Sequence, residues 1–280
     1  MNNAKSRLLE FTEPGYPVGL LDLETPPPIY VRGELADRPM VAIVGTRKCT
    51  RYGIDLAEAC GRVLAEFDWP VVSGLARGID AAAHRGMVAK SGRGVAVLGS
   101  GLDHIYPREN ASLLSQLLDC AGAVISEYPD GTPPDRWRFP ARNRIIAAMA
   151  SAVVVVESAL TGGSQITAVL GAEMGRPVFA FPGDVDRPAS VGTNRLIRDG
   201  AIPVLGSEDL VEELSLLPGF ETTRVRQSGI DAPSEGVAID DLPAVWGCSI
   251  SQVLSRIGEA EARGEFRREG DRIFPETRLK

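Results

Sequence analysis

The densest group of residues able to bind an anion lies between positions 136 and 144, where the sequence reads RWRFPARNR. Four arginines alternate there with two aromatic residues and an asparagine. Guanidinium groups bind phosphates through paired hydrogen bonds, and aromatic faces stack on unpaired bases. Aromatic residues in a proline-containing loop also serve as covers over a core, so Trp137 and Phe139 leave both interpretations open. The arginines, in a chain of formal charge −7, predict a local site for single-stranded nucleic acid.

Two glycine-containing loops are typical of anion sites at helix starts. The first is GTRK at 45–48, which follows the apolar run VAIV and precedes a helical pattern. The second is TGGSQIT at 161–167, after the run AVVVVE. Glycine lets the backbone approach an anion, and a helix start offers free N–H groups. A tight turn with solvated basic residues, or a plain N-cap by Ser164 or Thr167, would also account for these residues.

Neither loop has the spacing of a known nucleotide motif. G-x-G-x-x-G and G-K-[ST] are both absent from these loops, which disfavours NAD and nucleoside triphosphates, so we predict no cofactor. Asp80 and His84 lie four residues apart on one predicted helix face, which suits either a structural contact or an acid–base pair. Arg108, after the run VAVL, suits either a phosphate or solvent.

Composition excludes several classes of protein. The 280-residue chain has only two histidines and four scattered cysteines, so a metal site is not expected. The first residues lack the apolar stretch of a secretory signal, and the longest apolar run, at 145–156, is too short to cross a membrane. We therefore expect a cytoplasmic protein without a membrane contact.

The elements that must position these loops form an alternating pattern. Six buried-strand runs recur from residue 41 onward: VAIV (41–44), VVS (71–73), VAVL (95–98), AVIS (123–126), AVVVVE (152–157) and PVFAF (177–181). Apolar residues at helical spacing separate the first two runs. This pattern predicts an α/β fold with a doubly wound, mostly parallel sheet that binds ligands at the carboxyl ends of its strands.

The remaining segments flank this predicted domain, which spans 39–217. Residues 1–38 are rich in proline and predict an arm packed on the core, and residues 218–236 have the composition of a linker. Residues 237–280 predict a winged-helix domain of helix, turn, helix and hairpin. From residue 235 onward seven basic and nine acidic residues give a net charge of −2, which favours protein interaction or weak DNA contact over tight duplex binding.

Eight ordered motifs together resemble the DprA/Smf family, the DNA-processing proteins of bacterial transformation. They are VAIVGTR (41–47), SGLARGIDAAAH (73–84), VLGSGLDHIYP (97–107), ISEYP (125–129), FPARNRIIA (139–147), GGSQIT (162–167), GRPVFAFPGDV (175–185) and GTNRLIRDGA (192–201). The resemblance implies an extended Rossmann-like fold. It also implies a non-enzymatic mediator that binds and protects single-stranded DNA, forms a homodimer and loads the RecA recombinase in natural transformation. Many relatives carry a helical domain ahead of this part, for which 38 residues leave no room.

The resemblance also implies site residues. Those expected to bind DNA are Gly45, Thr46, Arg47, Arg108, Phe139, Arg142, Asn143, Arg144, Gly163 and Ser164. Those expected on the dimer or partner surface are Leu196, Ile197 and Ala201.

Two alternative functions stay open. One is a nucleotide-processing hydrolase similar to the LOG phosphoribohydrolases, whose P-G-G-x-G-T-x-x-E pattern supplies a catalytic glutamate. Here Gly162 and Gly163 are followed by SQITAVL, without an acid at that place. The other is a duplex-reading regulator that would use the three arginines of the predicted wing, Arg267, Arg268 and Arg272.

Overall fold

The structure is a computed structural model that describes residues 6–221, 237–243, 250, 253–254, 257–258, 261 and 266–275. The chain divides into two compact units, Met1–Arg224 and Val225–Lys280. The division falls within the segment predicted as a linker.

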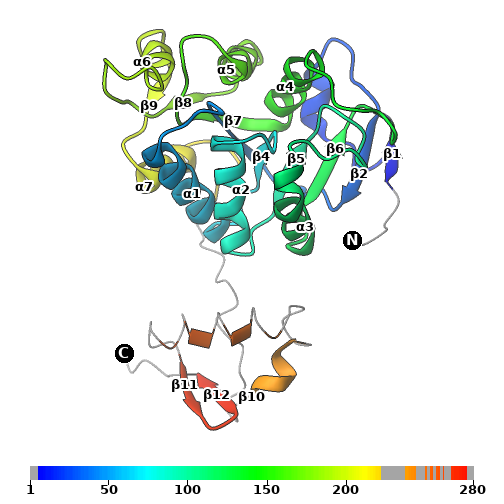
Figure 1. The fold of residues 1–280 in the computed structure, drawn as a ribbon, viewed down its shortest axis with the longest axis vertical. Coiled ribbons are helices and arrows are strands. Elements are labelled where there is room, and N and C mark those ends of the chain that lie inside the picture. Colours follow the sequence, from blue (N-terminus) through cyan, green and yellow to red (C-terminus); the bar gives the residue numbers. More distant parts are fainter. Residues whose placement is uncertain are drawn as a thin grey trace. The chain divides into compact units, whose positions relative to one another are not determined.

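The first unit is built on a sheet of nine strands in the order β1-β2-β6-β5-β4-β3-β7-β8-β9 (Figure 1). Every pairing from β6 across to β9 is parallel. The parallel strands are β3 (Met40–Val44), β4 (Val71–Ser73), β5 (Gly94–Val97), β6 (Ala123–Ser126), β7 (Ala150–Val155), β8 (Val178–Ala180) and β9 (Ile202–Pro203). The six predicted strand runs are therefore confirmed, and so is the doubly wound α/β fold.

Helices cover both faces of the sheet, which is why the strands are apolar on both sides. Residues of α1, α2 and α7 pack with alternate residues of β3 and β7 in one core cluster, and α3 packs beside β5 and β6. The intervening strand residues pack with α4, α5 and a short 3₁₀ helix, η1, on the other face. The helices are α1 (Arg51–Glu66), α2 (Ile79–Ala89), α3 (Ala111–Asp119), α4 (Arg138–Met149), α5 (Gly163–Glu173), α6 (Val191–Arg198) and α7 (Ser207–Ser215).

The first 38 residues do more than pack on this core. Strands β1 (Arg7–Leu9) and β2 (Ile29–Gly33) extend the sheet, because β2 pairs antiparallel with β6 and β1 pairs antiparallel with β2. Between them η1 (Val18–Asp22) buries Leu20 against the core. The run IYVRGEL at 29–35 is β-like in sequence and matches β2, whereas β1 is three residues long and has no continuous apolar run that would predict it.

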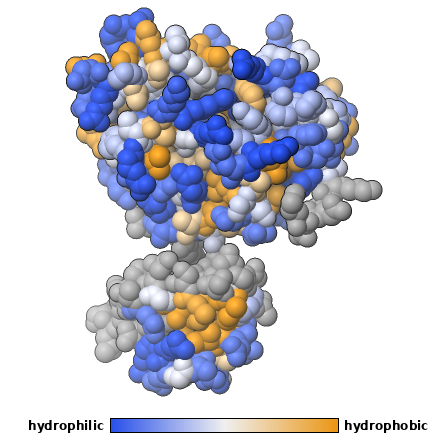
Figure 2. All heavy atoms as spheres, in the orientation of Figure 1, coloured by the Kyte–Doolittle hydropathy of each residue, from blue (hydrophilic) through white to orange (hydrophobic). Residues whose placement is uncertain are grey.

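The second unit contains a three-stranded sheet in the order β10-β12-β11. Strands β11 (Phe266–Glu269) and β12 (Arg272–Pro275) form the predicted hairpin, and β10 (Val237–Ala238) precedes the 3₁₀ helix η3 (Ile239–Asp241). The predicted helix–turn–helix lies largely outside the described residues, so the winged helix stays a prediction. Figure 2 shows a hydrophobic area on this unit, and among its described residues Ile250 and Leu254 are large, apolar and exposed.

The order of the strands fixes where a ligand can bind. The chain runs outward from β3 through β4 and β5, then crosses back so that β7 lies on the other side of β3. Loops that leave β3 and β7 therefore diverge above the sheet, and such a switch point opens a crevice at the carboxyl ends of the strands.

Candidate nucleic-acid interface

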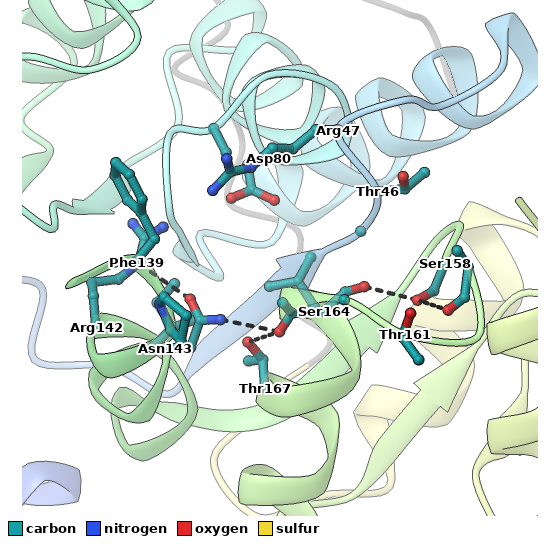
Figure 3. A pocket seen from close by; sticks show the side chains of 18 of the residues that line it. Thr46, Arg47, Asp80, Phe139, Arg142, Asn143, Ser158, Thr161, Ser164 and Thr167 are labelled. Carbon is teal, nitrogen blue, oxygen red and sulfur yellow. Dashed lines mark hydrogen bonds between the residues drawn. The ribbon is translucent and has the colours of Figure 1, made fainter. Parts of the chain in front are cut away.

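A cleft of about 490 Å³ lies at this switch point. Figure 3 shows side chains converging on it from three directions: the loop after β3 with the start of α2, the start of α4, and the loop after β7 with the start of α5. Its polar and aromatic lining residues are Thr46, Arg47, Asp80, Tyr106, Arg136, Phe139, Arg142, Asn143, Ser158, Thr161, Ser164 and Thr167. Three arginines against one carboxylate give this lining an excess of positive charge, which suits an anionic ligand.

The N-terminus of α1 is already occupied by a carboxylate of the protein itself. One oxygen of Glu157 accepts a hydrogen bond from the Thr50 N–H at 2.8 Å, and the other accepts from the Thr50 hydroxyl at 2.5 Å. The Thr50 hydroxyl oxygen in turn accepts from the Gly53 N–H, which caps the helix. Glu157 therefore stands beside the helix start where the sequence predicted an external phosphate, and its carboxylate accepts from the Thr50 N–H while the Thr50 hydroxyl accepts from the Gly53 N–H.

The 45–47 loop instead offers the Arg47 side chain. Gly45 is required because a Cβ at this position would lie 2.5 Å from the Ile79 side chain. The Thr46 N–H donates to the carbonyl oxygen of Glu157 at 2.7 Å, which fixes the loop. Arg47 is exposed, and its guanidinium lies over the ring of Phe139, 5.2 Å from the centroid. Within the described residues this guanidinium forms no hydrogen bond or ion pair, so it is free to bind a phosphate.

The N-terminus of α5 is the helix start that stays open to the cleft. In the part of the chain that the structure describes, no group accepts from the N–H of Gly163 or Ser164. The N-cap residue is Gly162, which has no side chain that could cap the helix, so neither Ser164 nor Thr167 is a plain N-cap. Instead the Ser164 hydroxyl lies 2.9 Å from that of Ser158.

Asn143 links the two helices that flank the cleft. Its side-chain amide donates to the Gly163 carbonyl at 3.0 Å, so α4 holds the start of α5 in place. Asn143 itself is buried, with 7% of its surface exposed. It thus orients the α5 N-terminus as much as it lines the cleft.

Arg142 was expected to bind DNA directly, but in the structure its side chain is buried and bonded to backbone carbonyls. Only 3% of it is exposed, and its guanidinium donates to the carbonyl of Gly74 at 2.8 Å and to that of Val97. It therefore ties together the carboxyl ends of β4 and β5. Burial lowers the pKa of Arg142 to about 10, and the charge of Asp80 opposes this shift, so the guanidinium remains a cation under the cleft at neutral pH.

Asp80 and His84 do not form the acid–base pair that their spacing allowed. Asp80 is buried, and its carboxylate accepts from the Gly74 N–H at 3.1 Å. Burial raises the pKa of Asp80, and the nearby Arg142 lowers it in part. Burial also lowers the pKa of His84 to about 4, so this ring is neutral at pH 7. Among the described contacts none joins the two side chains.

Two of the predicted arginines lie outside the cleft lining. The Arg144 guanidinium donates to the Glu127 carboxylate at 2.6 Å. Arg108 is exposed in the 3₁₀ helix η2 (Arg108–Asn110). Conversely, Tyr106, Arg136 and Thr161 line the cleft although they are not among the site residues that the resemblance implied. Arg136 belongs to the basic segment 136–144, so the high arginine content of that segment was the signal that pointed to Arg136 as a site residue.

The predicted partner residues lie near the β9 edge of the sheet. Leu196 and Ile197 are half-buried on α6, and Ala201 immediately precedes β9. Ile202 and Leu205 nearby are exposed, by 37% and 81% of their surface.

The fold and the cleft together define a Rossmann-like α/β protein with a cationic, aromatic-lined site at the carboxyl edge of its sheet. Residues 7–215 match the family model of DNA recombination-mediator protein A. The chain therefore belongs to the DNA recombination-mediator protein A family, as the eight motifs indicated.

Curated relatives agree with this assignment. The chain is 42% identical over 202 residues to Protein Smf of Escherichia coli, an alignment that covers 71% of this chain and 54% of that protein. It is 38% identical over 203 residues to DNA processing protein DprA of Bacillus subtilis, covering 71% of this chain and 68% of that protein. The chain thus spans about half to two thirds of the length of these relatives.

Two solved structures share the fold. One is DNA processing protein A of Streptococcus pneumoniae, with a TM-score of 0.69, 36% identity and coverage of 75% of each chain. The other is DNA processing protein A of Helicobacter pylori, described for its unique single-stranded DNA binding mode, with a TM-score of 0.67 and 29% identity. That match covers 75% of this chain and 95% of the H. pylori chain.

Within the described residues, no helix has the length and apolar character that crossing a membrane requires.

Proposed function

We propose that this protein is a recombination mediator that binds single-stranded DNA in the cleft between α4 and α5. The observation that carries the proposal is the placement of an unpaired guanidinium, Arg47, directly over an aromatic ring, Phe139, in a cleft that also contains an open helix N-terminus. A nucleotide of a single strand carries two groups that suit these side chains, a phosphate for the Arg47 guanidinium and a base for the Phe139 ring.

The arrangement favours a single strand over a duplex. A base can stack on Phe139 only if it is unpaired and turned out of a helical stack, and a duplex offers no such base without a cost in unpairing. The free N–H groups of Gly163 and Ser164 suit the phosphate of the same or a neighbouring nucleotide. Arg136 at the rim and Arg142 beneath the cleft add positive charge without reading any base.

We further propose that the protein acts as a homodimer that delivers the strand to RecA, as the family resemblance implies. The half-buried Leu196 and Ile197 and the exposed apolar residues around β9 suit a protein contact. Two clefts in one particle would raise the apparent affinity for a long strand through effective concentration. Light scattering of the wild type and of a Leu205→Asp variant tests this, and equal masses for the two would contradict the dimer surface.

The DNA-binding proposal is tested by fluorescence anisotropy with labelled poly-dT and a matched duplex at two salt concentrations. We expect tighter binding to the single strand and an affinity that falls as salt rises, because neutralised phosphates release counterions. Equal affinity for the two DNAs, or binding that does not respond to salt, would contradict it.

The alternative hydrolase activity is separable by experiment. The carboxylate that lines the cleft, Asp80, is buried and already bonded to the Gly74 N–H. In α5, residues 168–170 read AVL in the region where the related hydrolases have their catalytic acid. Incubation with AMP or a cytokinin-type nucleotide tests the alternative, and release of the free base would support it.

A further inference from the structure

Trp137 is an exposed aromatic residue just outside the cleft. It precedes α4, and 58% of its surface is exposed to solvent. A tryptophan normally buries most of its large apolar surface, so a ring held in water at this place needs a reason. Trp137 does not line the cleft, although Arg136 before it and Phe139 after it do.

The ring of Trp137 is held by its neighbours. The guanidinium of Arg138 lies 5.0 Å from the ring centroid of Trp137 and also 5.0 Å from that of Tyr128. The Tyr128 and Trp137 rings meet edge to face with centroids 6.2 Å apart. The indole N–H donates to the Asp135 carboxylate at 3.0 Å. The side chain is thus fixed before any ligand arrives, which reduces the entropy lost on binding.

The surroundings of this ring suit an unpaired base. Arg138 covers one side of the indole, and the exposed remainder offers a π-face on which any base can stack. Arg136 and Arg138 flank it and supply positive charge for the strand that carries the base. Because Trp137 and Phe139 are two residues apart, their Cα atoms lie within about 7 Å of each other. A strand that leaves Phe139 can therefore pass Trp137.

We infer that Trp137, braced by Arg138 and Tyr128, is a second base-stacking platform for the part of a single strand that extends beyond the cleft. This inference rests on the proposed function, since the occupant is the same DNA strand. It adds a site that a short oligonucleotide, confined to the cleft, does not reach.

The test compares a short dT oligonucleotide of about 4 nucleotides with a long one of about 16, which span the known range of single-strand site sizes. We expect Trp137→Ala to weaken binding of the long oligonucleotide by at least about fivefold, the smallest effect typical of one lost base stack, and to leave the short one unchanged. Trp137→Phe should restore most of the difference. Phe11→Ala, which removes an aromatic residue that is 53% exposed, serves as the matched control.

Fluorescence gives an independent readout. The chain has three tryptophans, of which Trp69 is only 1% exposed. In a Trp246→Phe background, we expect long dT to quench the emission, and the quenching to disappear when Trp137→Phe is added.

An unchanged affinity of Trp137→Ala for long dT, or an equal loss for both lengths, would overturn the inference while leaving the cleft proposal intact. Failure of the wild-type protein to bind either oligonucleotide would overturn the proposed function, and this inference with it.

Discussion

Replacing Arg47 by alanine removes the guanidinium that we assign to a DNA phosphate. A hydrogen bond to a charged group contributes about 1.5 to 3 kcal/mol. In the free protein this guanidinium lies over the Phe139 ring. Moving the guanidinium off an exposed ring to reach a phosphate costs about 0.5 to 1 kcal/mol. Within the described residues no carboxylate forms an ion pair with it, and the charge of Arg47 acts only at longer range on the buried Asp80 carboxylate. The difference, about 0.5 to 2.5 kcal/mol, corresponds to a Kd for single-stranded DNA raised about 2- to 60-fold.

Anisotropy titrations of labelled poly-dT at several salt concentrations measure both the loss and its origin. We expect the slope of log affinity against log salt to become shallower by about 0.7, the value for one phosphate contact on a single strand. Arg51→Ala is the matched control. Arg51 is four positions away with a side chain that is 82% exposed, but it pairs with Asp55 and does not line the cleft.

The reasoning would be refuted if Arg47→Ala bound with unchanged affinity, or if Arg51→Ala lost as much. A loss in Arg47→Ala without a change in the salt slope would mean that the side chain acts through Phe139 and not through a phosphate.

Three further outcomes follow from the described contacts. We expect Arg144→Ala to change DNA affinity by less than about twofold, because its guanidinium pairs with Glu127 outside the cleft; a loss as large as that of Arg47→Ala would contradict this placement. Glu157→Gln should lower the free energy of unfolding in urea by about 1 to 2 kcal/mol, because it weakens the cap of α1; full stability would show that the carboxylate does not hold that helix start. Burial lowers the pKa of His84 from 6.5 to about 4. Between these two pH values the unfolded state therefore binds a proton more readily than the folded state. The free energy of unfolding should fall by about 3 kcal/mol as the pH drops from about 6.5 to about 4. Urea unfolding over this pH range, with His84→Gln as the comparison, measures that fall, and equal pH slopes in the two proteins would contradict it.

Much of the fold could be predicted from local pattern. The apolar runs at β3 to β8 are long enough and uninterrupted enough to require cover on both faces, and the helical spacing between them indicates parallel connections. Strands β1 and β9 could not be predicted in this way. They are three and two residues long, and they exist because a neighbouring strand supplies their hydrogen bonds.

The candidate site was predicted in its location but not in the role of each residue. The basic segment and the two glycine loops do meet in one cleft, as strands with a common direction require. Their composition could not tell a phosphate ligand from a structural cation. Arg142 and Arg144 are two residues apart in the same motif, yet one is buried under the cleft and the other pairs with a glutamate outside it.

The sequence by itself determined the alternation of strands β3 to β8 with helices along the chain, the family, and the loops at which an anion could bind. All of these depend on residues close together in the chain. Only the tertiary structure decided which of those loops stays open. Glu157 fills the start of α1 from a position 107 residues away from Thr50, and Arg142 reaches Val97 across 45 residues. Contacts at such separations exist only once the sheet has formed, and they leave Arg47, Phe139 and the start of α5 as the cleft surface that we propose to bind a strand.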